Sequence, residues 1–126
     1  MSLKPVGAMV KLAAVVLGGA LLGAAPATAH HSFAMFDNTK DVTLVGTVKE
    51  FQWTNPHTWL QLMVDESGQQ VEWSIEGSSP NGLARKGWTR VSFKPGDKVT
   101  VIIHPLKDGT KGGSYVKATL SDGKVL

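Results

Sequence analysis

The sequence predicts an all-β fold with one short helix, built as a five-stranded OB-like Greek-key barrel. Two observations carry this prediction. Five segments alternate apolar and polar residues, and a short helix falls between the third and the fourth. A glycine inside the first segment indicates a bend or bulge, which a closed barrel needs. A small β-sandwich is the alternative, but closure suits a chain this short because it removes exposed strand edges.

The first 29 residues have the composition of a secretory signal peptide. Lys4 and Lys11 form a positively charged start, and residues 12–26 read LAAVVLGGALLGAAP. Residues 27–29 are Ala-Thr-Ala, which fits the small-residue rule for cleavage. A membrane anchor is the alternative, but the apolar run is shorter than the ~20 residues that a spanning helix needs. We therefore expect export to the periplasm and no stable membrane span after cleavage.

We expect three segments: a signal peptide (1–29), an N-terminal arm (30–40) and the barrel domain (41–126). Lys4 and Lys11 leave with the signal peptide, so 11 basic residues remain against 10 acidic ones and the formal charge falls from +3 to +1. A net charge this small does not indicate the basic surface that nucleic-acid-binding proteins have. The chain has no cysteine, which excludes disulfides, thiolate metal sites and cysteine nucleophiles.

The first three strands follow from alternation and turn residues. Residues 41–51 alternate, and Gly46 in their middle predicts a sharp bend or bulge. The Asn-Pro pair at 55–56 predicts a turn before the second strand, residues 57–65. The sequence ESGQ then predicts a hairpin turn into the third strand, residues 70–76.

A short helix and two further strands complete the predicted order. Ser79 is a suitable helix cap, Pro80 suits the first helical position, and Gly87 can end the helix. Residues 98–106 form the fourth predicted strand, and residues 114–126 form the fifth strand with a trailing turn.

No catalytic motif stands out in this sequence. Serine, histidine and aspartate occur, but no nucleophile elbow or comparable pattern does. Glu72 and Glu76 lie on the outer face of the third predicted strand, at a spacing that any exposed strand gives, while Trp73 points inward. We therefore expect a protein that is not an enzyme.

Four histidines of the predicted mature chain are candidate metal ligands: His30, His31, His57 and His104. In an OB fold, the loops between strands 1 and 2 and between strands 4 and 5 flank one binding surface. His57 lies where the first of these loops enters the second strand, and His104 lies where the fourth strand meets the other loop. The arm of about ten residues can reach across a small domain at ~3.3 Å per residue. Each histidine taken alone could equally be an ordinary terminal or turn residue.

A cut after Ala29 would make His30 the first residue of the mature protein. Its α-amine, with a pKa near ~7.7–8.0, and its ring could chelate one metal ion, and His31 adds a second imidazole. Nitrogen-rich sites favour Cu(II) in the Irving–Williams order, so copper is the expected cofactor, if there is one. Met35 and Met63 are possible additional soft ligands for Cu(I).

A second hypothesis involves no metal. Trp59, Gln61 and Met63 share the outer face of the second predicted strand, where OB folds often bind ligands by aromatic stacking. This Trp59 face could dock an envelope protein or a small organic ligand as an accessory module. Alternatively, Trp59 packs beneath Phe33 and Phe36 of the arm.

Five stretches carry a resemblance to a known family: HHSFAMFD, GTVKEFQWTNPHTWLQL, WSIEGSSPNGLARKGW, KPGDKVTV and HPLKDGTKGG. Together they resemble a family of small exported bacterial proteins of unknown function. The resemblance covers nearly the whole predicted mature chain. It implies export and a single domain, and it assigns no activity to any residue.

Overall fold

The computed structural model describes residue 2 and residues 33–126. The chain divides into two units, Met1–His30 and His31–Leu126, and the second contains the fold described below. His30, His31 and the predicted cleavage site lie outside the described residues, as does the predicted signal peptide apart from Ser2. In the part of the chain that the structure describes, no helix is both long enough and apolar enough to cross a membrane.

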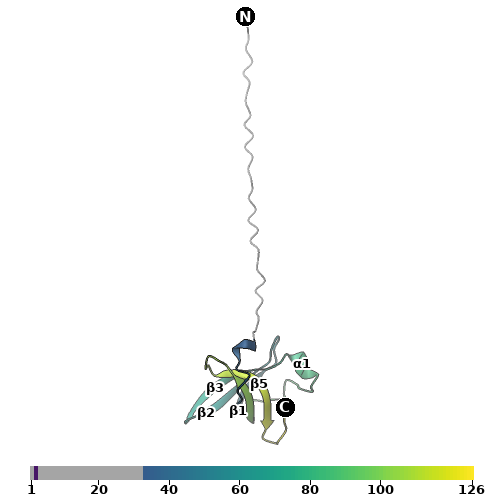
Figure 1. The fold of residues 1–126 in the computed structure, drawn as a ribbon. Coiled ribbons are helices and arrows are strands. Elements are labelled where there is room, and N and C mark those ends of the chain that lie inside the picture. The colour runs from purple at the N-terminus through teal and green to yellow at the C-terminus, as the bar shows by residue number, and fades with distance from the viewer. Residues whose placement is uncertain (1, 3–32) are drawn as a thin grey trace. The chain divides into compact units, whose positions relative to one another are not determined.

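Five strands form a closed barrel in the order β1-β2-β3-β5-β4 (Figure 1). The elements are η1 (Phe33–Met35), β1 (Val42–Gln52), β2 (Trp59–Glu66), β3 (Gln69–Glu76), α1 (Pro80–Ala84), β4 (Lys98–Pro105) and β5 (Gly112–Leu120). Neighbouring strands are antiparallel except β3 and β5, which pair in parallel. This is the strand order of the OB fold. The predicted fold class is therefore confirmed, as a closed barrel rather than two packed sheets.

The long strand β1 closes the barrel by pairing with β4 along its first half and with β2 along its second. Gly46 pairs with both neighbours, and a Cβ at this position would lie 2.5 Å from the Met63 carbonyl oxygen. The two strands approach so closely there that only glycine fits. The bulge, however, falls between Val48 and Glu50 rather than at Gly46 as predicted, because the register with β2 shifts there.

The predicted hairpin turn and the predicted ends of the short helix are present in the structure. Ser67 and Gly68 form the tip of the β2–β3 hairpin with φ of 54° and 87°, the left-handed values that such a turn requires. Ser79 caps α1, since its hydroxyl accepts a hydrogen bond of 3.2 Å from the Gly82 amide. Gly87 follows the helix with φ of 85°.

The last strand begins earlier than predicted. β5 begins at Gly112, two residues before the predicted start, and ends at Leu120, where the predicted trailing turn follows. The chain turns at Gly123, where φ is 86°, and comes back beside β5. The Leu126 amide then donates to the Ala118 carbonyl at 2.9 Å, so the final residues are tied to the barrel.

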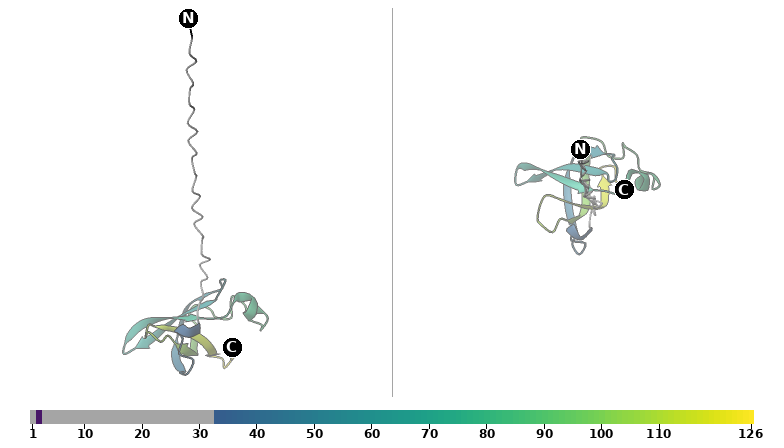
Figure 2. Two further views of the ribbon diagram at one scale, coloured as in Figure 1. Left: turned by 45° about the horizontal axis from the view of Figure 1, so that its top comes forward. Right: turned by 90° about the horizontal axis from the view of Figure 1, so that it is seen from above.

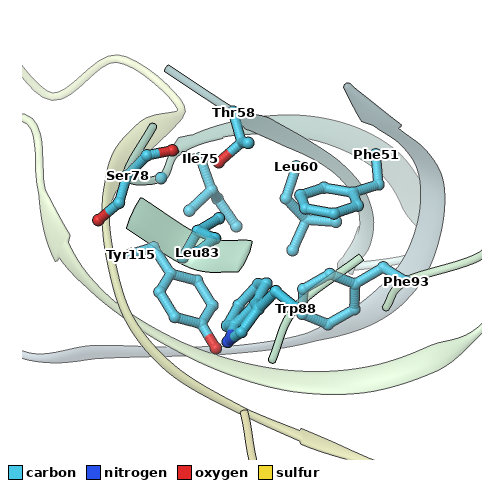
Figure 3. A pocket seen from close by; sticks show the side chains of 10 residues that line it. Phe51, Thr58, Leu60, Ile75, Ser78, Leu83, Trp88, Phe93 and Tyr115 are labelled. Atoms are coloured by element: carbon cyan, nitrogen blue, oxygen red, sulfur yellow. Dashed lines mark hydrogen bonds between the residues drawn. The ribbon is translucent and has the colours of Figure 1, made fainter. Parts of the chain in front are cut away.

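One end of the barrel interior is filled by aromatic rings, as Figure 3 shows. Trp88 packs edge-on against Phe93 and Tyr115, with ring centroids 5.6 and 5.4 Å apart, and Phe51 packs on Phe93 at 5.3 Å. Leu83 of α1 is buried beside them. The space left between these side chains is about 10 Å³, no more than one water molecule needs. We call this region the closed aromatic end.

The N-terminal arm packs on the barrel by backbone hydrogen bonds. The amide of Asp37 donates to the Pro105 carbonyl at 2.8 Å, and the amide of Lys107 donates to the Met35 carbonyl at 3.0 Å. Phe36 is buried and forms an antiparallel bridge with Leu106. The arm (blue in Figure 2) is therefore held against the end of β4 and the residues that follow it.

Candidate functional site

The arm and the outer surface of the barrel enclose a cleft of about 280 Å³, which we call the arm cleft. Phe33 and Phe36 come from the arm, Tyr115 comes from β5, and the polar lining includes His57 and Glu76. Three serine hydroxyls also line it, those of Ser78, Ser79 and Ser114. The arm cleft thus combines aromatic walls with an imidazole and a carboxylate, which is typical of ligand sites.

Glu76 reaches the arm cleft because of its strand register. It lies opposite Trp59 on β2 and opposite Ser114 on β5. Its neighbour Ile75 fills the core, so Glu76 points to the outer face as predicted. The prediction that this face is exposed is wrong at Glu76, whose side chain is only 9% exposed because it forms part of the wall beneath the arm.

His57 lies in the loop between β1 and β2, two residues before β2 begins and directly after the cis Asn55–Pro56 peptide bond. Its Nδ1 is 3.0 Å from the Gly77 carbonyl oxygen and 3.4 Å from Oε1 of Glu76. A carbonyl oxygen only accepts hydrogen bonds, so Nδ1 carries a proton. In the tautomer that this contact selects, the lone pair is on Nε2.

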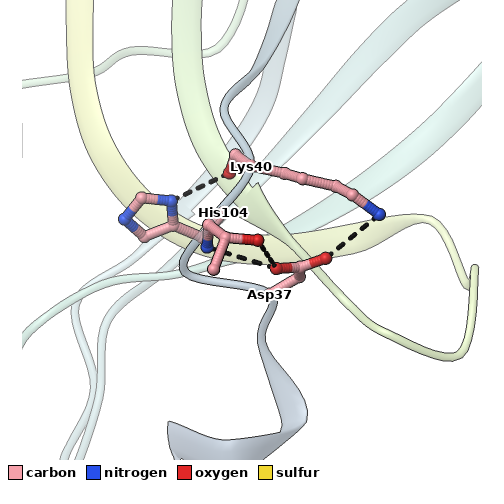
Figure 4. A network of polar contacts seen from close by, with 4 residues as sticks. Asp37, Lys40 and His104 are labelled. Atoms are coloured by element: carbon pink, nitrogen blue, oxygen red, sulfur yellow. Dashed lines mark hydrogen bonds and ion pairs between the residues drawn. The ribbon is translucent and has the colours of Figure 1, made fainter.

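His104 repeats this arrangement at the next-to-last residue of β4, close to the loop that follows the strand. Its Nδ1 is 3.0 Å from the Lys40 carbonyl oxygen (Figure 4). It is also 3.2 Å from Oδ1 of Asp41. His104 lies opposite Ser114, which in turn lies opposite Glu76. Two strand spacings, about 10 Å, therefore separate His104 from Glu76 along the sheet.

The two described histidines are held by different segments of the chain. The residues after β3 hold His57, and the start of β1 holds His104. Within residues 33–126, no three histidine, aspartate or glutamate side chains gather closely enough to hold a metal ion. The described residues thus offer histidines singly, and His30 and His31 lie outside the described residues.

The other predicted site residues are spread along β2 and the arm. Met35, Phe36 and Trp59 line a smaller, mostly apolar cavity of about 140 Å³ beside the arm cleft. Trp59 is half-buried there, next to the arm. Gln61 donates a long hydrogen bond of 3.5 Å to Gln52 on β1. Met63 lies further along β2 and does not line either cavity.

Asp37 fixes the turn that leads from the arm into β1. Its carboxylate accepts hydrogen bonds from the hydroxyl and the amide of Thr39, at 2.6 and 3.2 Å, and it lies 3.1 Å from the ammonium of Lys40. The hydroxyl of Thr39, then Lys40, lower the pKa of Asp37 to about 2. Because the carbonyl of Lys40 also holds His104, this turn links the arm to the ring position of that histidine.

Glu76 and Tyr115 line the site, although nothing in the sequence singles them out. No local pattern separates Glu76 from Glu72, since both alternate outward on β3; only the long-range placement of the arm buries one of them. Tyr115 belongs to both regions, because it lines the closed aromatic end and the arm cleft. Its hydroxyl donates to the Leu126 carbonyl at 2.8 Å, and burial raises its pKa above the ordinary tyrosine value.

Residues 19–116 match a family described as a family of unknown function (DUF6152). No curated protein sequence matches the chain. Among solved structures, the chain is similar to the mitochondrial single-stranded DNA-binding protein Rim1 of S. cerevisiae, with 14% sequence identity and a TM-score of 0.48. That similarity covers 65% of this chain and 94% of the yeast chain.

Proposed function

The chain belongs to the DUF6152 family, which has no known function, and we propose that it is an exported, non-enzymatic protein that binds a transition-metal ion, with Cu(II) as the first choice. The observation that carries the proposal is the setting of His57. This histidine lines the arm cleft together with Phe33 of the arm, and its Nδ1 contacts the Gly77 carbonyl.

The contacts of His57 are those of many metal-binding histidines. Such a histidine usually donates its other ring N–H to a backbone carbonyl or a carboxylate, which fixes the tautomer and the ring orientation. His57 has the Gly77 carbonyl at 3.0 Å and Glu76 at 3.4 Å from Nδ1. His104 has an equivalent pair of partners, so it is the second candidate ligand among the described residues.

Further nitrogen ligands would come from the predicted N-terminus. Phe33 lines the arm cleft together with His57, and His31 precedes Phe33 by two residues. With cleavage after Ala29, His30 contributes its α-amine and ring, and His31 contributes an imidazole or its peptide nitrogen.

Copper is the preferred ion because these donors are nitrogens. Amine and imidazole ligands bind Cu(II) most tightly among the divalent first-row ions, with Ni(II) and Zn(II) behind it. Met35 is exposed on the arm and is a reserve ligand for Cu(I), whereas Met63 on β2 is a weaker candidate since it lines neither cavity.

The first experiment is native mass spectrometry of the protein purified from the periplasm, with a Cu(II) titration followed by the d–d absorption band. Intact mass defines the first residue, and we expect a chain that begins at His30 and holds one copper ion against a competing chelator. His30→Ala should weaken binding most, and His57→Ala should weaken it on the order of tenfold or more. His104→Ala tests the second described histidine, and Lys94→Ala is the control. A different first residue, or equal affinities in His30→Ala, His57→Ala and Lys94→Ala, would refute the proposal.

The second candidate is an accessory module that docks a partner on the Trp59 face without any metal. The half-buried indole of Trp59, which lines a mostly apolar cavity of about 140 Å³ with Met35, favours it. A small organic ligand or an envelope protein would share this surface with the arm. This candidate predicts no d–d band on copper titration and a loss of partner binding in Trp59→Ala.

A further inference from the structure

We propose that the arm cleft binds a small organic cation, a primary ammonium carried on a short apolar or aromatic stem, with Glu76 as its counter-ion. This inference goes beyond the metal proposal and does not depend on it. It is carried by three features of the cleft: a buried carboxylate, its aromatic walls and its size.

Among residues 33–126, the carboxylate of Glu76 forms no ion pair with a lysine or arginine, whereas those of Glu66 and Glu72 do. Glu72 lies 2.7 Å from the ammonium of Lys49, and Glu66 lies 3.1 Å from that of Lys111. Glu76 is the more buried, at 9% side-chain exposure, yet among residues 33–126 its polar contact is with Nδ1 of His57 alone, at 3.4 Å.

That contact leaves the charge of Glu76 largely uncompensated. Nδ1 of His57 is closer to the Gly77 carbonyl, at 3.0 Å, and the imidazole carries a positive charge only when it is protonated. No lysine or arginine is among the described residues that line the cleft. Electrostatic interactions are stronger for a buried carboxylate than for an exposed one, so a cation that enters the cleft would gain from a contact with Glu76.

The walls of the cleft suit the rest of such a ligand. Phe33, Phe36 and Tyr115 place three aromatic rings around the same space, and aromatic faces attract cations as well as apolar stems. An ammonium has three N–H donors, and the hydroxyl of Ser114 lies beside Glu76 as a further acceptor.

The size of the cleft limits the ligand. At about 280 Å³, the cleft is at the lower end of the size range of ligand sites, so it suits a small ligand. A neutral ligand of that size would use the aromatic walls but not Glu76, and an anion would be repelled by it. The charge of the ligand therefore separates this proposal from simple apolar binding.

The test compares three ligands of similar shape that differ in charge: 2-phenylethylammonium, 2-phenylethanol and 3-phenylpropanoate. Binding is measured by calorimetry and by protein chemical shifts, on purified protein in the presence of a metal chelator. We expect the ammonium to bind at least tenfold more tightly than the alcohol, the carboxylate not to bind, and the shifts to cluster around Tyr115 and Glu76. Equal binding of ammonium and alcohol, or no binding of the ammonium, would overturn the proposal.

Two matched variants sharpen this test. Glu76→Gln keeps the shape of the side chain and removes its charge, so the preference for the ammonium over the alcohol should fall to less than twofold. Glu72→Gln removes an exposed carboxylate from the same strand and should keep the full preference. Similar losses in both variants would overturn the proposal. Because metal is excluded by the chelator, these results stand whether or not the protein binds copper.

Discussion

The closed aromatic end and the arm cleft differ in what fills them, although Tyr115 is a wall of both. At the closed end, hydrocarbon rings leave about 10 Å³ of space, whereas the arm cleft holds about 280 Å³ bordered by a carboxylate, an imidazole and three hydroxyls. Close packing of apolar side chains stabilises a fold, and polar groups around open space do not. The closed aromatic end therefore contributes to the stability of the fold, whereas the arm cleft beside it offers open space.

We expect the largest loss of folding stability from a substitution at the closed aromatic end. Phe93 is 2% exposed and contacts the rings of Phe51 and Trp88. Phe93→Ala removes these contacts and leaves a cavity, so we expect the free energy of unfolding to fall by about 3–5 kcal/mol. Urea unfolding monitored by circular dichroism measures this change.

Two variants serve as controls for that prediction. Val91→Ala alters a residue of the same loop that is 64% exposed, and it should change the free energy of unfolding by no more than about 0.5 kcal/mol. Glu76→Gln in the arm cleft should cost no more than about 1 kcal/mol, because the side chain keeps its shape. A loss at Glu76 as large as that at Phe93 would contradict the division between the two regions.

We expect an intermediate change in the free energy of unfolding when Tyr115 titrates. This residue lines both regions. Burial raises the pKa of its phenol, so the folded state holds this proton more tightly than the unfolded state does. The contribution to stability is complete below the ordinary tyrosine pKa of ~10 and is lost as the pH rises through and above that value. The chain has one tyrosine, so tyrosinate absorbance measures it directly. Ionisation in the folded protein at the ordinary pKa would show that the phenol is in contact with water.

We expect the smallest change in the free energy of unfolding for the titration of Asp37 in the arm. The pKa of Asp37 is lowered to about 2 by Thr39 and Lys40, so its ionised form favours the folded state. That contribution is present above the ordinary aspartate pKa of ~3.9 and is lost as the pH falls toward 2. The difference in stability between the wild type and Asp37→Asn should therefore shrink between pH 5 and pH 2, as urea unfolding at both values would show. A difference independent of pH would mean that the carboxylate charge does not hold the turn.

Local signals in the sequence predict most of the barrel. Alternation locates the strands, and Ser79 and Gly87 mark the short helix, because these features depend on residues close in the chain. The bulge was placed at Gly46 rather than beside Val48, since the register between β1 and β2 is set by side chains on both strands. The turn after β5 is predicted, but the pairing of Leu126 with Ala118 is not, because it joins residues on either side of that turn.

The candidate site is less predictable than the fold. The sequence identifies His57 and His104 by residue type, but not the backbone carbonyls that orient both rings. It also cannot distinguish Glu76 from Glu72, because the burial of Glu76 depends on where Phe33 and Phe36 of the arm pack. Contacts between the arm and the far end of β3 are made by residues about 40 positions apart, and no local pattern records them.

The shared position of Tyr115 gives the protein an intrinsic optical reporter. Its ring packs edge-on against Trp88, with 5.4 Å between the centroids, while its other side faces the arm cleft. Light absorbed by this tyrosine can pass to the adjacent indole by resonance energy transfer. A ligand that enters the arm cleft and moves the phenol would therefore change tryptophan emission, so occupancy could be followed without attaching a dye.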